Sequence, residues 1–112
     1  MNRLALIAIA LAASTTAASA YDYSRGDRID AREAAQARRI EHGRRTGQLT
    51  WYETQKLRAE QRRIHRMEAW ARRDGHVSRE EARRIGRAQD AADRHIYEES
   101  HDGQTSRRRR VW

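Results

Sequence analysis

The 112-residue sequence contains no cysteine, no proline and no phenylalanine. Without cysteine, no disulfide can stabilise the fold in an oxidising compartment, and neither a thiol nucleophile nor a lipidated leader is available. Because proline is absent, no pyrrolidine ring interrupts a helix, which favours long helices. The chain also lacks the Gly-x-Ser-x-Gly and phosphate-loop motifs of common enzymes. These absences favour an all-α, non-enzymatic protein, for which we expect no cofactor.

Large aliphatic side chains are scarce beyond residue 20. A small apolar set leaves a monomer near the stability threshold, and cores of this kind often need a partner chain. We therefore expect a homodimer of helical chains. The large aliphatic residues are Ile29, Ile40, Leu49, Leu57, Ile64, Met67, Val77, Ile85, Ile96 and Val111.

The first twenty residues have the three parts of a secretory signal peptide. Arg3 supplies the positive charge, residues 4–13 are almost wholly apolar, and residues 18–20 read Ala-Ser-Ala, like a cleavage site. The apolar run is too short to span a bilayer stably. We expect cleavage after Ala20, no transmembrane anchor thereafter, and a periplasmic or secreted protein. The alternative is an uncleaved membrane anchor.

Two stretches share the pattern Gly-x-apolar-Ser/Thr-x-x-Glu. Residues 47–53 read Gly-Gln-Leu-Thr-Trp-Tyr-Glu, and residues 75–81 read Gly-His-Val-Ser-Arg-Glu-Glu. In each stretch, the hydroxyl of Thr50 or Ser78 can accept a hydrogen bond from the backbone N–H three residues later. The glutamate at that later position can in turn accept a hydrogen bond from the backbone N–H of Thr50 or Ser78. The pattern predicts two helix starts that are 28 residues apart, with one long helix between them.

Small and apolar residues recur with helical spacing in three segments, separated by short glycine-containing links. Short links between long helices place neighbours antiparallel. The predicted fold class is therefore all-α, with three helices in an up-down-up hairpin or small bundle. The expected parts are a flexible lead-in at 21–27, a helical domain at 28–101 with helices at about 28–41, 50–73 and 78–100, and a disordered Arg-rich tail at 102–112.

One face of each expected helix carries the core residues at the spacing of a coiled-coil seam. The first seam has a mixed character, because glutamate and glutamine stand between its two isoleucines. The expected seams are Ile29, Glu33, Gln36 and Ile40; Leu57, Ile64 and Ala71 with Met67; and Ala82, Ile85, Gln89, Ala92 and Ile96.

The chain has 24 basic and 16 acidic residues, a net charge of +8, and every basic residue except Lys56 is arginine. Two rows of arginine repeat every fourth residue, and like charges at this spacing are mildly destabilising. We expect compensation either by acidic residues of a neighbouring helix or protomer, or by an anionic client protein, lipid headgroup or polyanion. Nucleic acid is an unlikely partner for an exported protein. The candidate binding residues are Arg58, Arg62, Arg66, Arg79, Arg83 and Arg87.

A second candidate site lies at the end of the third expected helix. His95, Glu98, Glu99, His101 and Asp102 fall within eight residues, and several of them are one helical turn apart. Imidazole and carboxylate groups are ligands of zinc and copper, so two or three of these side chains could converge on such an ion. The alternative is solvated charge near a helix C-terminus.

The run Leu49-Thr50-Trp51-Tyr52-Glu53, followed by Gln61, resembles a variant of the Leu-Thr-x-x-Gln signature of small periplasmic helical chaperones and metal-stress proteins. Glutamate replaces the glutamine of that signature. Residues 28–102 also resemble a set of uncharacterised small exported proteobacterial helical proteins with Gly-x-Leu-Thr-x-x-Glu and Asp-Gly-x-Val-Ser-x-x-Glu motifs. The chaperone resemblance implies antiparallel helical dimers with a basic concave face that holds unfolding clients.

These observations predict an exported, non-enzymatic helical binding protein, chaperone-like or stress-related. It would hold acidic or partly unfolded envelope proteins on its arginine rows, with Trp51, Tyr52 and Trp70 either packed at helix ends or available for apolar contact. The alternatives are a periplasmic zinc- or copper-binding protein that uses the cluster from His95 to Asp102, and a purely structural envelope protein.

Overall fold

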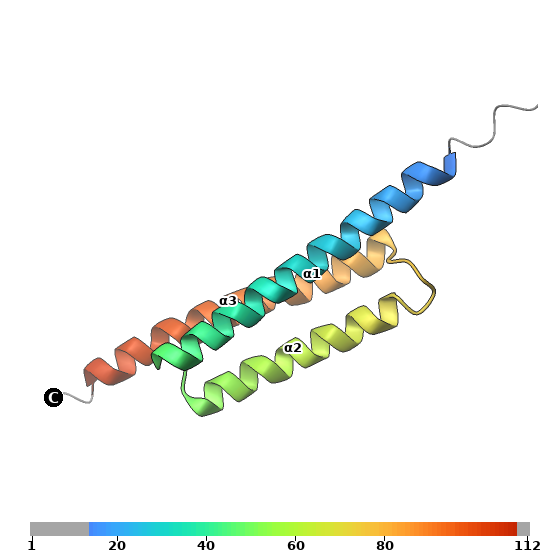
Figure 1. The fold of residues 1–112 in the computed structure, drawn as a ribbon. Helices are drawn as coiled ribbons and strands as arrows, with labels where there is room; N and C mark the ends of the chain where they lie inside the picture. Colours follow the sequence, from blue (N-terminus) through green and yellow to red (C-terminus); the bar gives the residue numbers. More distant parts are fainter. Residues whose placement is uncertain (1–13, 110–112) are drawn as a thin grey trace, which may run out of the picture.

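A computed structural model describes the backbone of residues 14–109 and the side chains of residues 24–102. Within these residues the chain forms three helices and no strand: α1 (Ser14–Thr46), α2 (Trp51–Ala71) and α3 (Arg79–Arg109). Each helix packs against the other two. Figure 1 shows α1 and α3 running side by side in the same direction, with α2 antiparallel to both. The predicted all-α, up-down-up arrangement is confirmed.

Both predicted helix starts are present as complete capping boxes. The backbone N–H of Glu53 donates to Thr50 Oγ1 at 3.1 Å, and the N–H of Thr50 donates to the Glu53 carboxylate at 2.8 Å. Ser78 and Glu81 repeat this exchange at 3.1 and 2.9 Å. The apolar residues just before the two caps, Leu49 and Val77, are buried. Each repeat therefore both starts a helix and anchors the preceding link to the core.

The links turn at Gly47 and Gly75, which have φ values of 73° and 89°, a region that side chains disfavour. Gly43, by contrast, lies inside α1, and a Cβ there would fall 2.7 Å from Leu49 Cγ. The N–H of Leu49 also donates to the Gly43 carbonyl at 3.0 Å. Gly43 thus allows the link to fold closely back on α1, and the helix continues to Thr46 instead of ending near residue 41.

The predicted seams form the core, which is divided into two apolar clusters. One contains Ile29, Ile64, Ala71, Val77, Ile85 and Ala92, with Met67, Ala82 and Ala88 packed against it. The other contains Ile40, Leu49, Leu57 and Ile96. Glu33, which we placed in the first seam, is instead half-buried at the edge of α1.

A layer of glutamine side chains joins the three helices. On α1, Gln36 lies between Ile29 and Ile40 of the two clusters, and its Nε2 donates to the Gln89 carbonyl at 2.9 Å. Gln61 Nε2 donates to Gln36 Oε1 at 3.0 Å, and Gln89 Nε2 donates to the Ile29 carbonyl at 3.0 Å. Because buried amides need partners, these bonds favour one register of the three helices.

Two further helix boundaries differ from those expected. Residues 21–27, expected as a flexible lead-in, belong to α1. Arg25 Nη1 donates to the Val77 carbonyl at 3.1 Å, and Arg72 Nη2 donates to the Gly26 carbonyl at 3.3 Å, so contacts with the rest of the bundle hold this segment. At the other end, α3 includes residues 102–109 of the expected tail. A single glycine costs a helix about 1 kcal/mol, which is not enough to end it.

The expected leader stays a prediction, because residues 1–13 lie outside the described residues and residues 14–20 begin α1. Over the described residues, none of the three helices contains an apolar stretch of the length that a membrane span requires. Residues 110–112, at the end of the expected tail, also lie outside the described residues.

Candidate functional site: a basic groove between α1 and α3

The structure places the two predicted arginine rows at different edges of the bundle. Arg58, the first member of the α2 row, faces α1, where its Nη2 donates to Glu41 Oε2 at 3.0 Å. Arg62 and Arg66 are exposed along α2. Arg79 and Arg83, on α3, instead line a groove shared with α1. The rows therefore do not form the single basic surface that their spacing alone allowed.

Glu41 supplies an acidic partner for arginines at the α1–α2 edge. Arg44 bonds its carboxylate at 2.6 Å, and Arg45 and Arg58 lie within ion-pair distance of it. The hydrogen bond from Arg44, together with the positive charges around the carboxylate, lowers the pKa of Glu41 to about 2. Arg58 thus has an acidic partner within its own chain and is a poor candidate for binding an anion.

The groove between α1 and α3 has a volume of about 640 Å³ and a strongly basic lining. Arg25, Arg28 and Arg32 line it from α1, and Arg79 and Arg83 line it from α3. Its apolar floor consists of Ile29 and Ala82, and Gly86 adds no side chain. We call this surface the basic groove.

Three of these five arginines have no hydrogen-bond or ion-pair partner among the described residues: Arg28, Arg79 and Arg83. The other two are engaged. Arg25 donates to the Val77 carbonyl, and Arg32 bonds both Asp90 and Asp93. The basic groove consequently carries excess positive charge along both walls.

Asp93, on α3, bonds Arg32 of the basic groove and two further side chains of α1. Its Oδ2 accepts from Arg32 at 2.6 Å, and its Oδ1 accepts from Gln36 at 3.0 Å and from Arg39 at 2.9 Å. Desolvation raises the pKa of Asp93, but the hydrogen bonds from Arg32 and Gln36 and the nearby guanidinium charges outweigh it, so the pKa is lowered overall. For Arg32, desolvation lowers the pKa, and the bonds to Asp93 and Asp90 reverse that effect.

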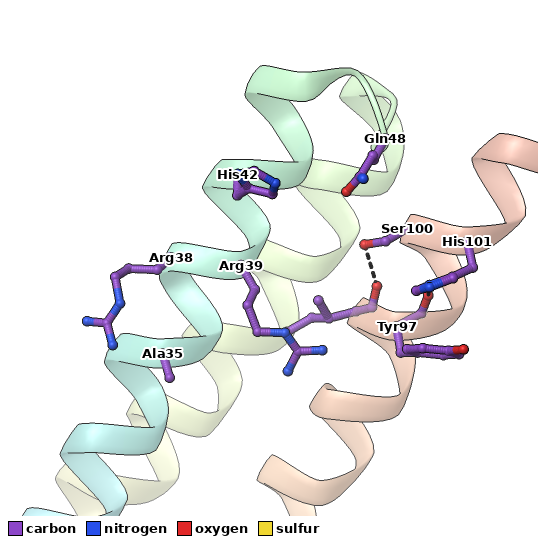
Figure 2. Close-up of a pocket in the computed structure, with 9 residues that line it drawn as sticks. Ala35, Arg38, Arg39, His42, Gln48, Tyr97, Ser100 and His101 are labelled. Carbon is purple, nitrogen blue, oxygen red and sulfur yellow. Dashed lines mark hydrogen bonds between the residues drawn. The ribbon is translucent and has the colours of Figure 1, made fainter.

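A second hollow, of about 500 Å³, lies on the same α1–α3 side near the link between α1 and α2. Figure 2 shows Arg39 extending from α1 toward α3, where Tyr97 and His101 lie, with Gln48 on the link above. The rings of Tyr97 and His101 stack with centroids 3.8 Å apart, and Tyr97 is 58% exposed. The α1–α3 side therefore offers guanidinium groups at both ends and aromatic rings near the link between α1 and α2.

The structure does not bring the predicted metal cluster of α3 together. His95 turns to α2, where its Nδ1 lies 2.9 Å from Glu60 Oε2. Glu99 accepts from Lys56 Nζ at 2.8 Å, and His101 Nδ1 lies 2.7 Å from the Tyr97 carbonyl. Glu98 and Asp102 are exposed. Of the predicted ligands, His95, Glu99 and His101 therefore each contact a residue outside the predicted cluster.

Among the described residues, the group whose ligand atoms do converge is Glu33, His65 and Glu68, at the α1–α2 edge. The sequence offered only half of this signal, because His65 and Glu68 are three residues apart on one helix while Glu33 belongs to another. Near this group, a hydrogen bond with Glu68, followed by desolvation, raises the pKa of Asp30 despite the opposing charge of Arg72.

The aromatic residues at the ends of α2 do not pack into the bundle. Trp51, Tyr52 and Trp70 are 76%, 72% and 66% exposed, which departs from the edge packing we considered for them. The Arg73 guanidinium lies 4.0 Å from the centre of the Trp70 ring, in a cation–π contact. These rings remain available for contact with another molecule.

No protein-family model, curated protein or solved structure matches this chain.

Proposed function

We propose that this protein is an exported, non-enzymatic binding protein that holds acidic polypeptide segments of partly unfolded envelope proteins in the basic groove. The observation that carries the proposal is the set of three arginines, Arg28, Arg79 and Arg83, which line one groove without an acidic partner among the described residues. A concave surface lined by one sign of charge focuses the electrostatic field and attracts ions of opposite sign.

The composition of the basic groove favours a polypeptide over a small anion. Its walls supply guanidinium groups, which bond carboxylates with two parallel N–H donors. Its floor supplies the apolar side chains of Ile29 and Ala82. An unfolded acidic segment offers carboxylates and apolar groups along one chain, so it can use both. The expected leader would place such an encounter in the cell envelope.

The basic groove predicts an association that is fast and sensitive to salt. A fluorescently labelled peptide of alternating glutamate and leucine should bind with micromolar affinity at low ionic strength and more weakly at 0.15 M salt, as measured by anisotropy. The variant Arg28→Gln/Arg79→Gln/Arg83→Gln should bind at least tenfold more weakly, because it removes the unpaired charges of the groove.

The matched control is Arg62→Gln/Arg66→Gln/Arg87→Gln, which removes the same charge from exposed positions that do not line the groove. It should retain binding within about threefold. Equal losses in both triple variants would show that only net charge matters and would refute the basic groove as the site. The same variants should differ in suppressing aggregation of an unfolding model protein; if wild type suppresses none, the chaperone-like function fails.

A further inference from the structure

A group of ionisable side chains bridges α1 and α2 on the edge away from the basic groove. His65 Nδ1 lies 3.1 Å from Glu33 Oε1, and one ligand atom each from Glu33, His65 and Glu68 lie within 4.8 Å of one another. In a tetrahedral zinc site with ligands about 2.1 Å from the ion, neighbouring ligand atoms are about 3.4 Å apart. The observed group therefore needs only a small side-chain adjustment to reach that spacing.

Glu68 is the unusual member of this group, because it is buried. Its side chain is only 7% exposed, and Arg72 bonds its Oε1 at 2.7 Å. Among the described residues, no donor reaches Oε2, which is buried as well. A buried carboxylate oxygen without a partner is costly, and a bound cation is one way to compensate it.

The local charge also favours a cation. Asp30, Glu33 and Glu68 supply three carboxylates. Within residues 24–102 the only guanidinium bonded to them is that of Arg72, which bonds Asp30 at 2.8 Å and Glu68 at 2.7 Å. With all four groups ionised, two negative charges remain in excess. A divalent ion would neutralise them.

The donor set indicates which divalent ion fits. One imidazole and two carboxylates suit zinc, whereas magnesium and calcium prefer oxygen ligands alone. His65 is exposed, so the site opens to solvent, which can supply a fourth ligand. His65 and Glu68, one turn apart on α2, project together toward Glu33 on α1.

We propose that Glu33, His65 and Glu68 form a zinc-binding site that ties α1 to α2. This site is separate from the basic groove and does not depend on the function proposed for that groove.

Titration of the metal-free protein with zinc chloride, followed by calorimetry, tests the site. Wild type should bind one Zn²⁺ per chain, and zinc should raise its Tm, because a ligand that binds only the folded state stabilises it. Magnesium chloride should give no comparable heat. His65→Ala and Glu68→Gln should each weaken zinc binding at least tenfold, and zinc should no longer raise their Tm.

The pair His95 and Glu60 provides a matched control, since it joins α2 and α3 through a similar 2.9 Å contact and has no third ligand in the described part of the chain. His95→Ala should bind zinc as wild type does. Glu68→Gln keeps the side-chain shape and removes a buried charge, so circular dichroism should show it folded. Absence of zinc binding by wild type, binding unchanged in both site variants, or an equal loss in His95→Ala would each overturn the proposal.

Discussion

Gln61 Nε2 on α2 donates to Gln36 Oε1 on α1. The Nε2 of Gln36 in turn donates to the Gln89 carbonyl and to the Asp93 carboxylate on α3. One side chain thus contacts both other helices through polar bonds in the middle of a small core. Gln36 is 1% exposed, so water cannot replace these bonds. The glutamine layer specifies which residues of the three helices lie at the same level.

Gln36→Ala should lower the free energy of unfolding by about 2–4 kcal/mol, because it removes the acceptor of the buried Gln61 amide and a donor to the Gln89 carbonyl, and it opens a cavity. Urea denaturation monitored by circular dichroism measures this change. Gln55→Ala, on the same bundle but outside the glutamine layer, should cost less than about 0.5 kcal/mol. Similar losses for the two variants would contradict the role assigned to Gln36.

The small core predicts self-association. Leu57 is 1% exposed, and Leu57→Ala should cost about 2–5 kcal/mol, enough to unfold a marginal monomer at low concentration. If chains pair, the Tm of wild type should rise with protein concentration, and sedimentation should give a dimer mass. A monomer mass with a concentration-independent Tm would remove the expected homodimer, and with it the alternative that the arginine rows are neutralised by a second copy.

The lowered pKa of Asp93 predicts how stability depends on pH. A carboxyl whose folded pKa lies below its unfolded value of about 3.8 contributes stability above that value, and this contribution is lost as the pH falls through the folded pKa. Asp93→Asn should therefore be less stable than wild type at pH 7, and the difference should shrink below pH 4. Urea midpoints at pH 7, 4 and 2.5 measure it. A constant difference would contradict the stabilising bonds from Arg32.

Gly86 lies within α3 at the floor of the basic groove, and a Cβ there meets no atom within 4 Å. Gly86→Ala should raise the free energy of unfolding by about 0.5–1 kcal/mol, because alanine favours the helix and fits the space. Gly86→Leu should fill the groove and weaken the acidic peptide while leaving the fold intact. Undiminished peptide binding by a folded Gly86→Leu would place the peptide elsewhere.

Export has its own test, which is independent of the fold. Mass spectrometry of secreted protein should find Tyr21 at the N-terminus, as expected for cleavage after the Ala-Ser-Ala sequence. An intact leader in the membrane fraction would refute cleavage and favour the anchor alternative.

Local patterns of residues were enough to predict the helical fold class, both capping boxes and most of the core seams. These features depend on interactions between residues three or four positions apart, which the order of residues states directly. Thr50 and Glu53 bond each other wherever α2 packs, and Leu57 and Ile64 share one face whatever lies opposite. The extension of α1 through residues 21–27 escaped prediction, because Arg25 and Gly26 are held by residues about fifty positions away.

Which charged residues meet could not be predicted from these patterns, because it depends on how the helices pack. Arg58 and Arg79 belong to similar rows, yet Arg58 bonds Glu41, whereas Arg79 lines the basic groove together with Arg28. Likewise, His95 pairs with Glu60 on α2, and Glu33 joins His65 and Glu68. These contacts depend on the rotation and register of whole helices, which the buried core and the glutamine layer set together. The spacing of residues within any one helix therefore cannot predict them.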